Sequence, residues 1–167
     1  MAPPAAGAAS PGPGRGRLAA IVLALAVLIA DQATKLLVLG VDFAAGPIRV
    51  APFADITLVM NRGISYGLFQ QDGMGRWLLV AFTIVASLAL ALWLWRARRT
   101  VTRIAIALIL GGAVGNLIDR VVYGAVVDFV HLHWGDWSWY IFNIADAAIV
   151  VGVAVLILES LVPRADG

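Results

Sequence analysis

The sequence predicts an all-α membrane protein with four transmembrane helices and a small β-rich loop subdomain on the extracytoplasmic side. Three observations lead to this fold class. Of the 167 residues, 62% are hydrophobic and only 13% are charged, whereas roughly 25% of residues are charged in a soluble domain. The apolar residues form four stretches, each close to the roughly 20 residues that a helix needs to cross a membrane. Basic residues gather on one side of these stretches, which predicts their orientation.

The four helices follow one another with short connections. We expect them at residues 18–39, 77–95, 104–123 and 143–162. Together they make a single membrane domain over residues 18–163. Residues 1–17 are rich in proline, glycine and alanine, which predicts a flexible cytoplasmic tail, and residues 164–167 form a second cytoplasmic tail.

The first apolar stretch has a competing interpretation as a cleavable signal peptide, because basic residues precede it. The stretch runs well past the length of a typical signal-peptide core, and no small-residue cleavage site followed by polar sequence ends it. These features favour a first helix that is retained in the mature protein.

Arginines concentrate in the segments that we assign to the cytoplasm. The connection between the second and third expected helices contains Arg96, Arg98, Arg99 and Arg103. Arg15 and Arg17 precede the first helix, and Arg164 follows the fourth. The other two loops either balance their arginines with aspartates or are acidic. The positive-inside rule therefore places both termini in the cytoplasm.

The loop after the first helix is expected to contain short strands. Residues 44–60 mix β-branched residues with proline and aspartate and show no helical stripe, a pattern typical of strands. This segment would form the extracytoplasmic subdomain between the first and second helices. A small interfacial helix is expected at residues 65–70. Asn61 and Gly63 lie in a polar turn that could present amide groups to a bound chain, although a plain turn explains them equally.

The composition excludes several kinds of site. The chain has no cysteine, which excludes disulfides, thiolate nucleophiles and cysteine metal ligands. Only His131 and His133 could supply imidazole ligands, and no HExxH motif contains them, so we expect neither a metal nor a cofactor. The net charge of +2 is small, and no basic stripe with interleaved aromatic residues predicts nucleic-acid binding.

Ionisable residues within the apolar sequence fall toward one end of the predicted bundle. Each helical residue rises by about 1.5 Å, so Asp31 and Lys35 lie toward the outer end of the first helix and Asp119 toward the outer end of the third. Asp128 follows the third helix, and Asp146 lies in the first turn of the fourth. Because a charge at membrane depth is costly, this gathering predicts a functional polar site.

Asp128 and Asp146 form a candidate catalytic pair. Two carboxylates placed together cannot both ionise at low cost, so one keeps a proton near neutral pH. One member could then activate water while the other protonates a leaving amine. A structural interpretation competes, because Asn143 as an N-cap would place Asp146 in a capping box. That interpretation does not explain Asp128, which lies in Val-Val-Asp-Phe-Val with no helix start after it.

The remaining polar residues have structural as well as functional interpretations. Asp119 could be a third catalytic candidate or the ion-pair partner of Lys35. Asp31 and Lys35 share a helix face at positions i and i+4, so they could also pair with each other. Asn116 and Arg120 are likewise four residues apart and could hold one carboxylate of the pair or a backbone carbonyl.

Three other functions remain open on these residues alone. Lys35 is the only lysine, so a serine–lysine hydrolase is conceivable, with Ser65 or Ser138 as nucleophile, although no GxSxG or SxxK motif supports it. A transporter or proton channel would use the acids as a relay, but the second and fourth helices have no ionisable residue in their cytoplasmic halves before Glu159. A structural membrane subunit would use the same polar residues to satisfy one another.

Four motifs in order resemble the lipoprotein signal peptidase family, also called signal peptidase II. They are DQATK at Asp31–Lys35, NRG at Asn61–Gly63, GNLIDRVVYGAVVDF at Gly115–Phe129 and FNIADAAI at Phe142–Ile149. The third and fourth motifs are long and specific. The second is looser, because Ile64, Ser65 and Tyr66 follow it where the family typically has small residues and Phe or Trp.

The resemblance implies a bacterial inner-membrane aspartic endopeptidase without a cofactor. Such an enzyme removes the signal peptide from diacylglyceryl-modified prolipoproteins, cutting on the N-terminal side of the lipidated cysteine near the extracytoplasmic face. By motif position, Asp128 rather than Asp119 is the catalytic partner of Asp146. The implied supporting or substrate-binding residues are Asp31, Lys35, Asn61, Gly63, Asn116, Asp119, Arg120 and Asn143. The expected partners are the lipid-modified prolipoprotein and membrane lipids, with the enzyme acting as a monomer and binding no nucleic acid.

Overall fold

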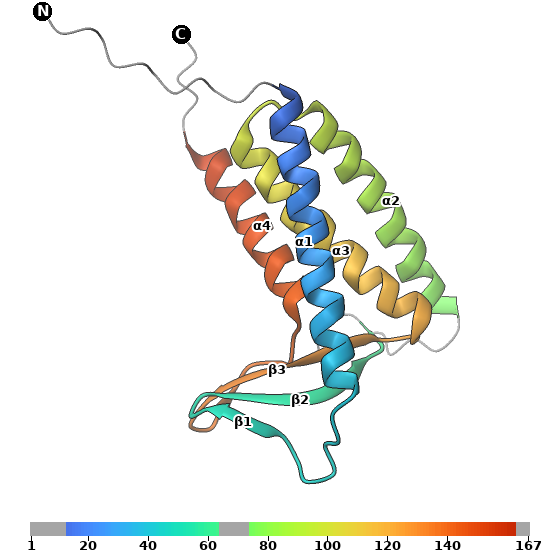
Figure 1. Ribbon diagram of the computed structural model, residues 1–167, viewed down its shortest axis with the longest axis vertical. Helices are drawn as coiled ribbons and strands as arrows, with labels where there is room; N and C mark the ends of the chain where they lie inside the picture. The colour runs from blue at the N-terminus through green and yellow to red at the C-terminus, as the bar shows by residue number, and fades with distance from the viewer. Residues whose placement is uncertain (1–12, 64–73, 163–167) are drawn as a thin grey trace, which may run out of the picture.

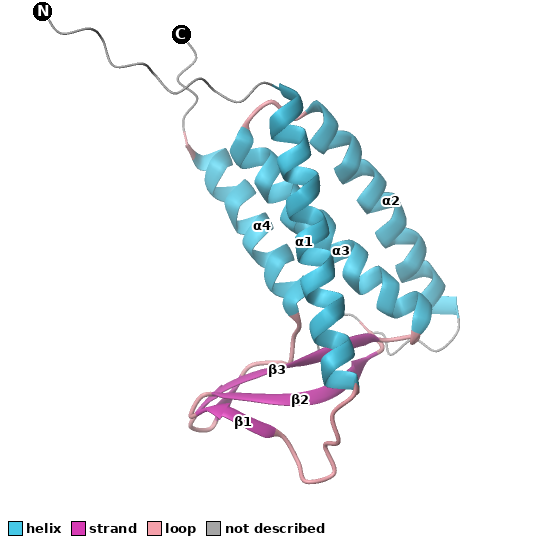
Figure 2. Cartoon of the chain, in the orientation of Figure 1, coloured by secondary structure: helices cyan, strands magenta, loops and turns pink. Residues whose placement is uncertain are grey.

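Four long helices lie side by side, and a small sheet crosses one end of them (Figure 1; Figure 2). The structure is a computed structural model that describes residues 13–63 and 74–162. Within these residues, four helices are long and apolar enough to cross a membrane. They are α1 (Pro13–Leu39), α2 (Met74–Arg96), α3 (Thr100–Val122) and α4 (Ile144–Leu161). The predicted four-helix membrane fold is confirmed.

The helix limits differ most from the prediction at the start of α1. This helix begins at Pro13, so residues 13–17, which we expected to belong to a tail, are helical. Proline is well tolerated in a first helical turn, because its missing N–H has no partner there anyway. Residues 1–12, the small helix expected at residues 65–70 and the tail expected at residues 164–167 lie outside the described residues.

The helix α3 is the central helix of the bundle. In its apolar 18-residue window 44% of the residues are buried, compared with 11–22% in the other three helices. Small residues allow its neighbours to come close. A Cβ atom on Gly115 would lie 2.5 Å from Asp31 Oδ2 of α1, and one on Gly152 of α4 would lie 2.6 Å from the Ala105 carbonyl oxygen of α3. The polar residues of α1, α3 and α4 are therefore held within contact of one another.

The sheet is built from both loops at its end of the bundle. The described strands pair antiparallel in the order β1 (Ile48–Ala51), β2 (Ala54–Asn61), β3 (Val126–Trp134) and β4 (Trp137–Ser138). The strands expected within residues 44–60 are confirmed by β1 and β2. The strands β3 and β4 were not expected, because the sequence interpretation placed Asp128 simply beyond the third helix. Val126, Val127 and Val130 favour a strand, but the partner strand β2 is distant in the sequence.

A glycine turn carries the chain from α3 into β3. Gly124 has a φ of 75°, a left-handed conformation that glycine adopts without steric cost. Arg76, at the start of α2, packs against this turn and donates from Nη2 to the Val121 carbonyl oxygen at 2.7 Å. The turn directs β3 beneath the end of the bundle, which brings Asp128 to the start of α4. The start of α1 and the end of α4 lie together at the opposite end of the bundle (Figure 1).

Candidate active site

The polar residues from the four motifs meet where the bundle joins the sheet, and they form two groups. The first group, the Lys35 cluster, contains Asp31, Lys35 and Asp119. The second group, the aspartate pair, contains Asp128 and Asp146. Three asparagines surround the pair and are Asn61, Asn116 and Asn143. All of these side chains were predicted from the sequence, and the structure brings them together.

The Lys35 cluster is an ion-paired group with no access to water. The Lys35 Nζ atom lies 2.8 Å from Asp31 Oδ2 and 2.7 Å from Asp119 Oδ2, and it donates to Asn116 Oδ1 at 2.9 Å. An ammonium group has three donors, so all of them are used. Asp31 and Asp119 are 0% exposed and Lys35 is 1% exposed. Both ion pairs considered from the sequence are therefore present at once.

The other oxygen atoms of the cluster hold the surrounding backbone. Asp31 Oδ1 accepts from the Ala145 N–H of α4 at 2.9 Å, and Asp119 Oδ2 accepts from the Val127 N–H of β3 at 3.0 Å. Gln32 Nε2 donates to Asp119 Oδ1 at 3.0 Å. The sequence interpretation missed Gln32, although its position beside Asp31, as a polar residue at membrane depth, was a usable signal. The cluster thus fixes the two segments that carry the aspartate pair.

The same contacts argue against a serine–lysine hydrolase in the described part of the chain. Lys35 has committed its three donors to Asp31, Asp119 and Asn116. Ser138 lies on β4, where its Oγ atom is 2.7 Å from His131 Nε2. Ser65, the other serine considered, lies outside the described residues.

Asp128 is buried on β3 and held by two carboxamide groups. Asn61 ends β2 opposite Val126, so Asn61 and Asp128 are diagonal neighbours on one face of the sheet. Asn61 Nδ2 donates to Asp128 Oδ2 at 2.9 Å, and Asn143 Nδ2 donates to Oδ1 at 2.7 Å. Burial raises the pKa of Asp128 to about 7, against the opposing effect of the Asn61 hydrogen bond, and the charge of Asp146 also raises it.

Asp146 belongs to a helix cap and to the pocket at the same time. The capping box considered from the sequence is present, since the Asp146 N–H donates to Asn143 Oδ1 at 2.9 Å and the Asn143 N–H lies 3.4 Å from Asp146 Oδ2. The other oxygen, Oδ1, accepts from Asn116 Nδ2 at 2.8 Å. The cap therefore orients Asp146 without occupying its whole carboxylate.

Asn116 connects the Lys35 cluster to the aspartate pair, and its neighbours fix its orientation. Lys35 can only donate hydrogen bonds, so the Asn116 atom beside it must be the oxygen. Asn143 Nδ2 donates to the same oxygen at 3.1 Å. The Asn116 amide nitrogen must then face Asp146, where it has a carboxylate acceptor. Arg120 Nη1 lies 3.4 Å from the Asn116 carbonyl oxygen, and Arg120 also lines the same pocket as both aspartates, whose charges act on its guanidinium.

The aspartate pair opens onto a pocket of about 240 Å³. Asn61, Gly63, Asn116 and Arg120 line it together with both aspartates, and Tyr140, Ile149 and Val150 add an aromatic and apolar wall. The Gly63 N–H donates to Asn61 Oδ1 at 3.1 Å, which ties the expected polar turn to the end of β2. No member of the Lys35 cluster lines the pocket. Across residues 13–63 and 74–162, no three His, Cys, Asp or Glu side chains are grouped as metal ligands.

Such a pocket can support acid–base chemistry. Two carboxyl groups face one small space, each is held by neutral donors, and one of them binds a proton near neutral pH. One carboxylate can accept a proton from water while the other carboxyl group donates one.

The chain is similar to one kind of protein along most of its length. The family model described as signal peptidase (SPase) II matches residues 23–162. A lipoprotein signal peptidase of Methylobacterium radiotolerans is 60% identical over 154 residues, covering 90% of this chain and 88% of the relative. That of Methylorubrum extorquens is 58% identical over 146 residues, covering 86% and 85%.

Solved structures show the same similarity. A bacterial membrane enzyme determined at 2.3 Å resolution is 32% identical with a TM-score of 0.77, covering 86% of this chain and 87% of that one. A second, at 1.9 Å resolution, is 32% identical with a TM-score of 0.76, covering 89% and 94%.

Proposed function

This chain belongs to the signal peptidase II family, and we propose that it removes the signal peptides of bacterial prolipoproteins. Membership makes it a multi-pass membrane peptidase. The proposed substrate is a prolipoprotein whose cysteine carries a diacylglyceryl group, and the proposed scissile bond lies on the N-terminal side of that cysteine. The proposed location is the bacterial inner membrane, with a monomeric enzyme.

The observation that supports this function best is the way the aspartate pair is held. Asp128 and Asp146 line one pocket, and carboxamide groups donate hydrogen bonds to both side chains. Neutral donors leave the pair able to share a proton, and burial outweighs the effect of the Lys35 charge, which lowers the pKa of Asp128. The pKa of about 7 for Asp128 supports the same conclusion.

The proposed reaction is water attack on the peptide carbonyl. The ionised member of the pair accepts a proton as the water oxygen bonds to the carbonyl carbon. The protonated member donates a hydrogen bond to the carbonyl oxygen and then transfers its proton to the leaving amine nitrogen. The shared proton belongs to the pair as a unit. Asn116 and Asn143 keep the two carboxyl groups in place throughout, which is the preorganisation that such chemistry needs.

The surroundings of the pocket suit a lipid-linked substrate. Ile149 and Val150 of α4 line the pocket, and Val150 is 63% exposed on the outer surface of the bundle. A diacyl chain could therefore lie along α4 while the peptide enters from the sheet. We place the sheet on the extracytoplasmic side, because the opposite end of the bundle contains the arginine-rich connection between α2 and α3.

The test is cleavage of a lipidated precursor by Asp128→Asn and Asp146→Asn variants in reconstituted membranes. We expect either change to lower turnover by about 10²- to 10⁴-fold, the range of a lost acid or base, without a large loss of thermal stability. Asp55→Asn is a matched control, because Asp55 lies on β2, pairs with His133 at 3.0 Å and does not line the pocket. Near-normal turnover in either pair variant would disprove the assignment, and a large loss of stability would favour a structural role.

A further inference from the structure

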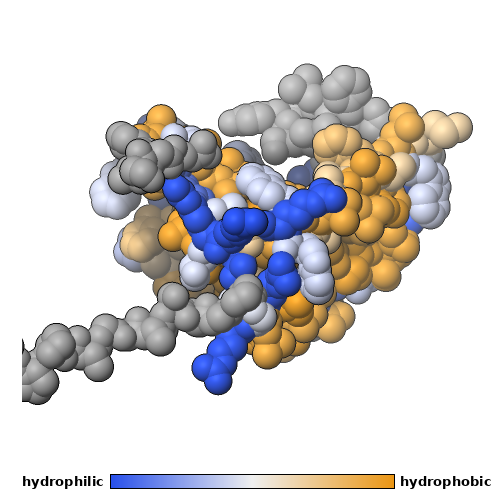
Figure 3. All heavy atoms as spheres, turned by 90° about the horizontal axis from the view of Figure 1, so that it is seen from above, coloured by the Kyte–Doolittle hydropathy of each residue, from blue (hydrophilic) through white to orange (hydrophobic). Residues whose placement is uncertain are grey.

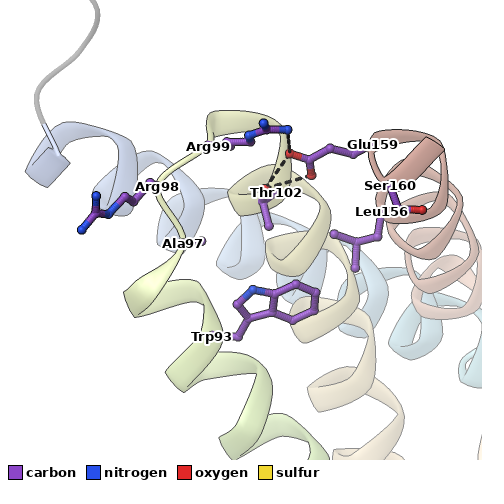
Figure 4. A pocket seen from close by; sticks show the side chains of 8 residues that line it. All are labelled: Trp93, Ala97, Arg98, Arg99, Thr102, Leu156, Glu159 and Ser160. Carbon is purple, nitrogen blue, oxygen red and sulfur yellow. Dashed lines mark hydrogen bonds and ion pairs between the residues drawn. The ribbon is translucent and has the colours of Figure 1, made fainter. Parts of the chain in front are cut away.

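A second pocket lies at the end of the bundle opposite the aspartate pair. It has a volume of about 320 Å³ and lies between the connection from α2 to α3 and the last turns of α4 (Figure 4). The lining residues that matter here are Trp93, Arg98, Arg99, Thr102, Leu156 and Glu159. None of these residues takes part in the proposed peptidase reaction, so the pocket needs a separate explanation.

The pocket has a polar opening and an apolar floor. Arg99, Thr102 and Glu159 lie together at the level of the helix ends, whereas Trp93 and Leu156 lie farther along α2 and α4 toward the middle of the bundle (Figure 4). In a membrane the ends of spanning helices lie at the headgroup level, where tryptophan is enriched. The pocket therefore has the polarity of a phospholipid, with the polar part at the surface and the apolar part below it.

The charged groups at the opening are Arg99 and Glu159, whereas the side chain of Arg98, which also lines the pocket, points away from them (Figure 4). Thr102 Oγ1 donates to both carboxylate oxygens of Glu159 at 2.8 Å. Arg99 Nη1 lies 3.6 Å from Glu159 Oε1, and its side chain remains 53% exposed, so its guanidinium can still take another acceptor.

This whole end of the molecule is basic. Figure 3 views it from above and shows hydrophilic side chains gathered over the helix ends, with hydrophobic surface around them. Part of this charge is used in packing. Arg103 is buried and donates to the Ala97 carbonyl oxygen at 3.0 Å, and Arg17 lies over the Trp95 ring at 4.7 Å. Arg99 differs in that its side chain lies beside an open pocket.

We propose that this pocket binds an anionic phospholipid, with its phosphate at Arg99 and its acyl chain against Trp93 and Leu156. Arginine suits this task because its planar guanidinium matches the geometry of phosphate oxygens. The carboxylate of Glu159 opposes an anion, and it limits the affinity by occupying Arg99. The site is independent of the peptidase reaction and lies at the other membrane surface.

The test uses quenching of tryptophan fluorescence by phospholipids with brominated chains. The purified full-length protein in detergent micelles is titrated with brominated phosphatidylglycerol or brominated phosphatidylcholine, and Trp93→Phe identifies the signal of Trp93. We expect the phosphatidylglycerol to quench Trp93 at the lower lipid fraction. Arg99→Gln should raise the half-quenching fraction by about fivefold, the usual effect of one basic residue at an anionic surface. Arg96→Gln is the matched control, because Arg96 ends α2 but does not line the pocket.

Each further result supports or overturns the proposal. Glu159→Gln should tighten phosphatidylglycerol binding by freeing Arg99. Weaker binding in that variant, with phosphatidylethanolamine as the best ligand, would mean that Glu159 binds an ammonium group and would overturn the proposal. Equal effects of Arg96→Gln and Arg99→Gln would show that binding depends on the overall positive charge of this end of the molecule rather than on the pocket. Full competition by inorganic phosphate would make it a site for the free anion. Unchanged quenching in Trp93→Phe would show that the acyl chain does not bind beside Trp93 and would overturn the proposal. Cleavage activity of the variants checks that they are folded.

Discussion

The Lys35 cluster and the aspartate pair each contain two aspartates, but these two sets of aspartates have different hydrogen-bonding partners. Asp31 and Asp119 share one ammonium group and accept backbone N–H donors, with no exposed surface. Asp128 and Asp146 accept from carboxamides and face a pocket. An ammonium group and backbone N–H groups hold the first two acids, whereas the neutral donors on the second two suit the proposed exchange of a proton. Under the proposed function, the partners of a buried carboxylate, rather than its depth, distinguish a structural aspartate from a catalytic one.

The largest expected effect comes from removing the cation of the Lys35 cluster. Lys35→Met would leave Asp31 and Asp119 buried without a positive charge, and losing one partner of a buried ion pair costs about 3–5 kcal/mol of stability. We expect a large fall in the denaturation midpoint in detergent, with loss of cleavage following from loss of fold. Arg49→Met is the control, because Arg49 is 72% exposed and lies 3.6 Å from Asp55. An unchanged midpoint for Lys35→Met would show that the cluster does not anchor the fold.

A smaller loss of stability is expected when a larger side chain crowds the Lys35 cluster. A Cβ atom on Gly115 would lie 2.5 Å from Asp31 Oδ2, so Gly115→Ala must displace Asp31 or separate α1 from α3. Overpacking of this kind costs about 1–3 kcal/mol, which a denaturation curve would measure. Gly14→Ala is the matched control, since a Cβ atom there meets nothing within 4 Å and alanine favours a helix over glycine. Equal midpoints for the two variants would contradict the close contact.

The proton on the pair should appear in the pH dependence. Asp128 keeps its proton up to a pH of about 7, compared with its ordinary pKa of 3.8. Cleavage should therefore fall as the pH rises through about 7, because both members of the pair are then ionised. The folded state binds this proton more tightly than the unfolded state, so this carboxyl group makes stability fall between pH 3.8 and about 7; the sign follows from proton linkage. Asp128→Asn should lack that part of the stability slope, and an identical slope would contradict the assignment.

The smallest expected effect concerns the hydrogen bond from Asn61 to Asp128. Asn61 donates to Asp128 and lowers its pKa, so Asn61→Ala should move the loss of cleavage at high pH to a still higher pH. The measurement is the pH profile of cleavage at constant substrate. Met60→Ala is a suitable control, because neighbouring strand residues point to opposite faces of the sheet. A profile that does not move in Asn61→Ala would show that this bond does not tune Asp128.

The helices could be predicted because their signal is local. Length and apolar composition alone identify a spanning helix, and the limits of α2, α3 and α4 lie close to those expected. The strand β3 could not be predicted in the same way, since its pairing with β2 joins segments far apart in the chain. Asn61 and Asp128 are 67 residues apart, and no local pattern reports that contact.

The site was predictable in its membership but not in its arrangement. Charge at membrane depth identified Asp31, Lys35, Asp119 and Asp146, and turn, spacing and capping patterns pointed to the asparagines before the motifs implied a supporting role for them. The sequence could not show that Lys35 binds both Asp31 and Asp119 at once, because Asp119 lies on α3 and the other two residues lie on α1. Gln32 was not predicted as a site residue, because an uncharged amide within a membrane is less costly than a charge and so gives a weaker signal. Its side chain nevertheless donates a hydrogen bond to Asp119 Oδ1.

The hydrogen bond from Ala145 to Asp31 has a consequence for the biogenesis of the protein. It closes a separation of 114 residues between the first and the last spanning helix. A ribosome must therefore release nearly the whole chain before Asp31 receives this donor and before Asp146 takes its place in α4. A partly inserted chain that still lacks α4 therefore also lacks this hydrogen bond and the capped position of Asp146.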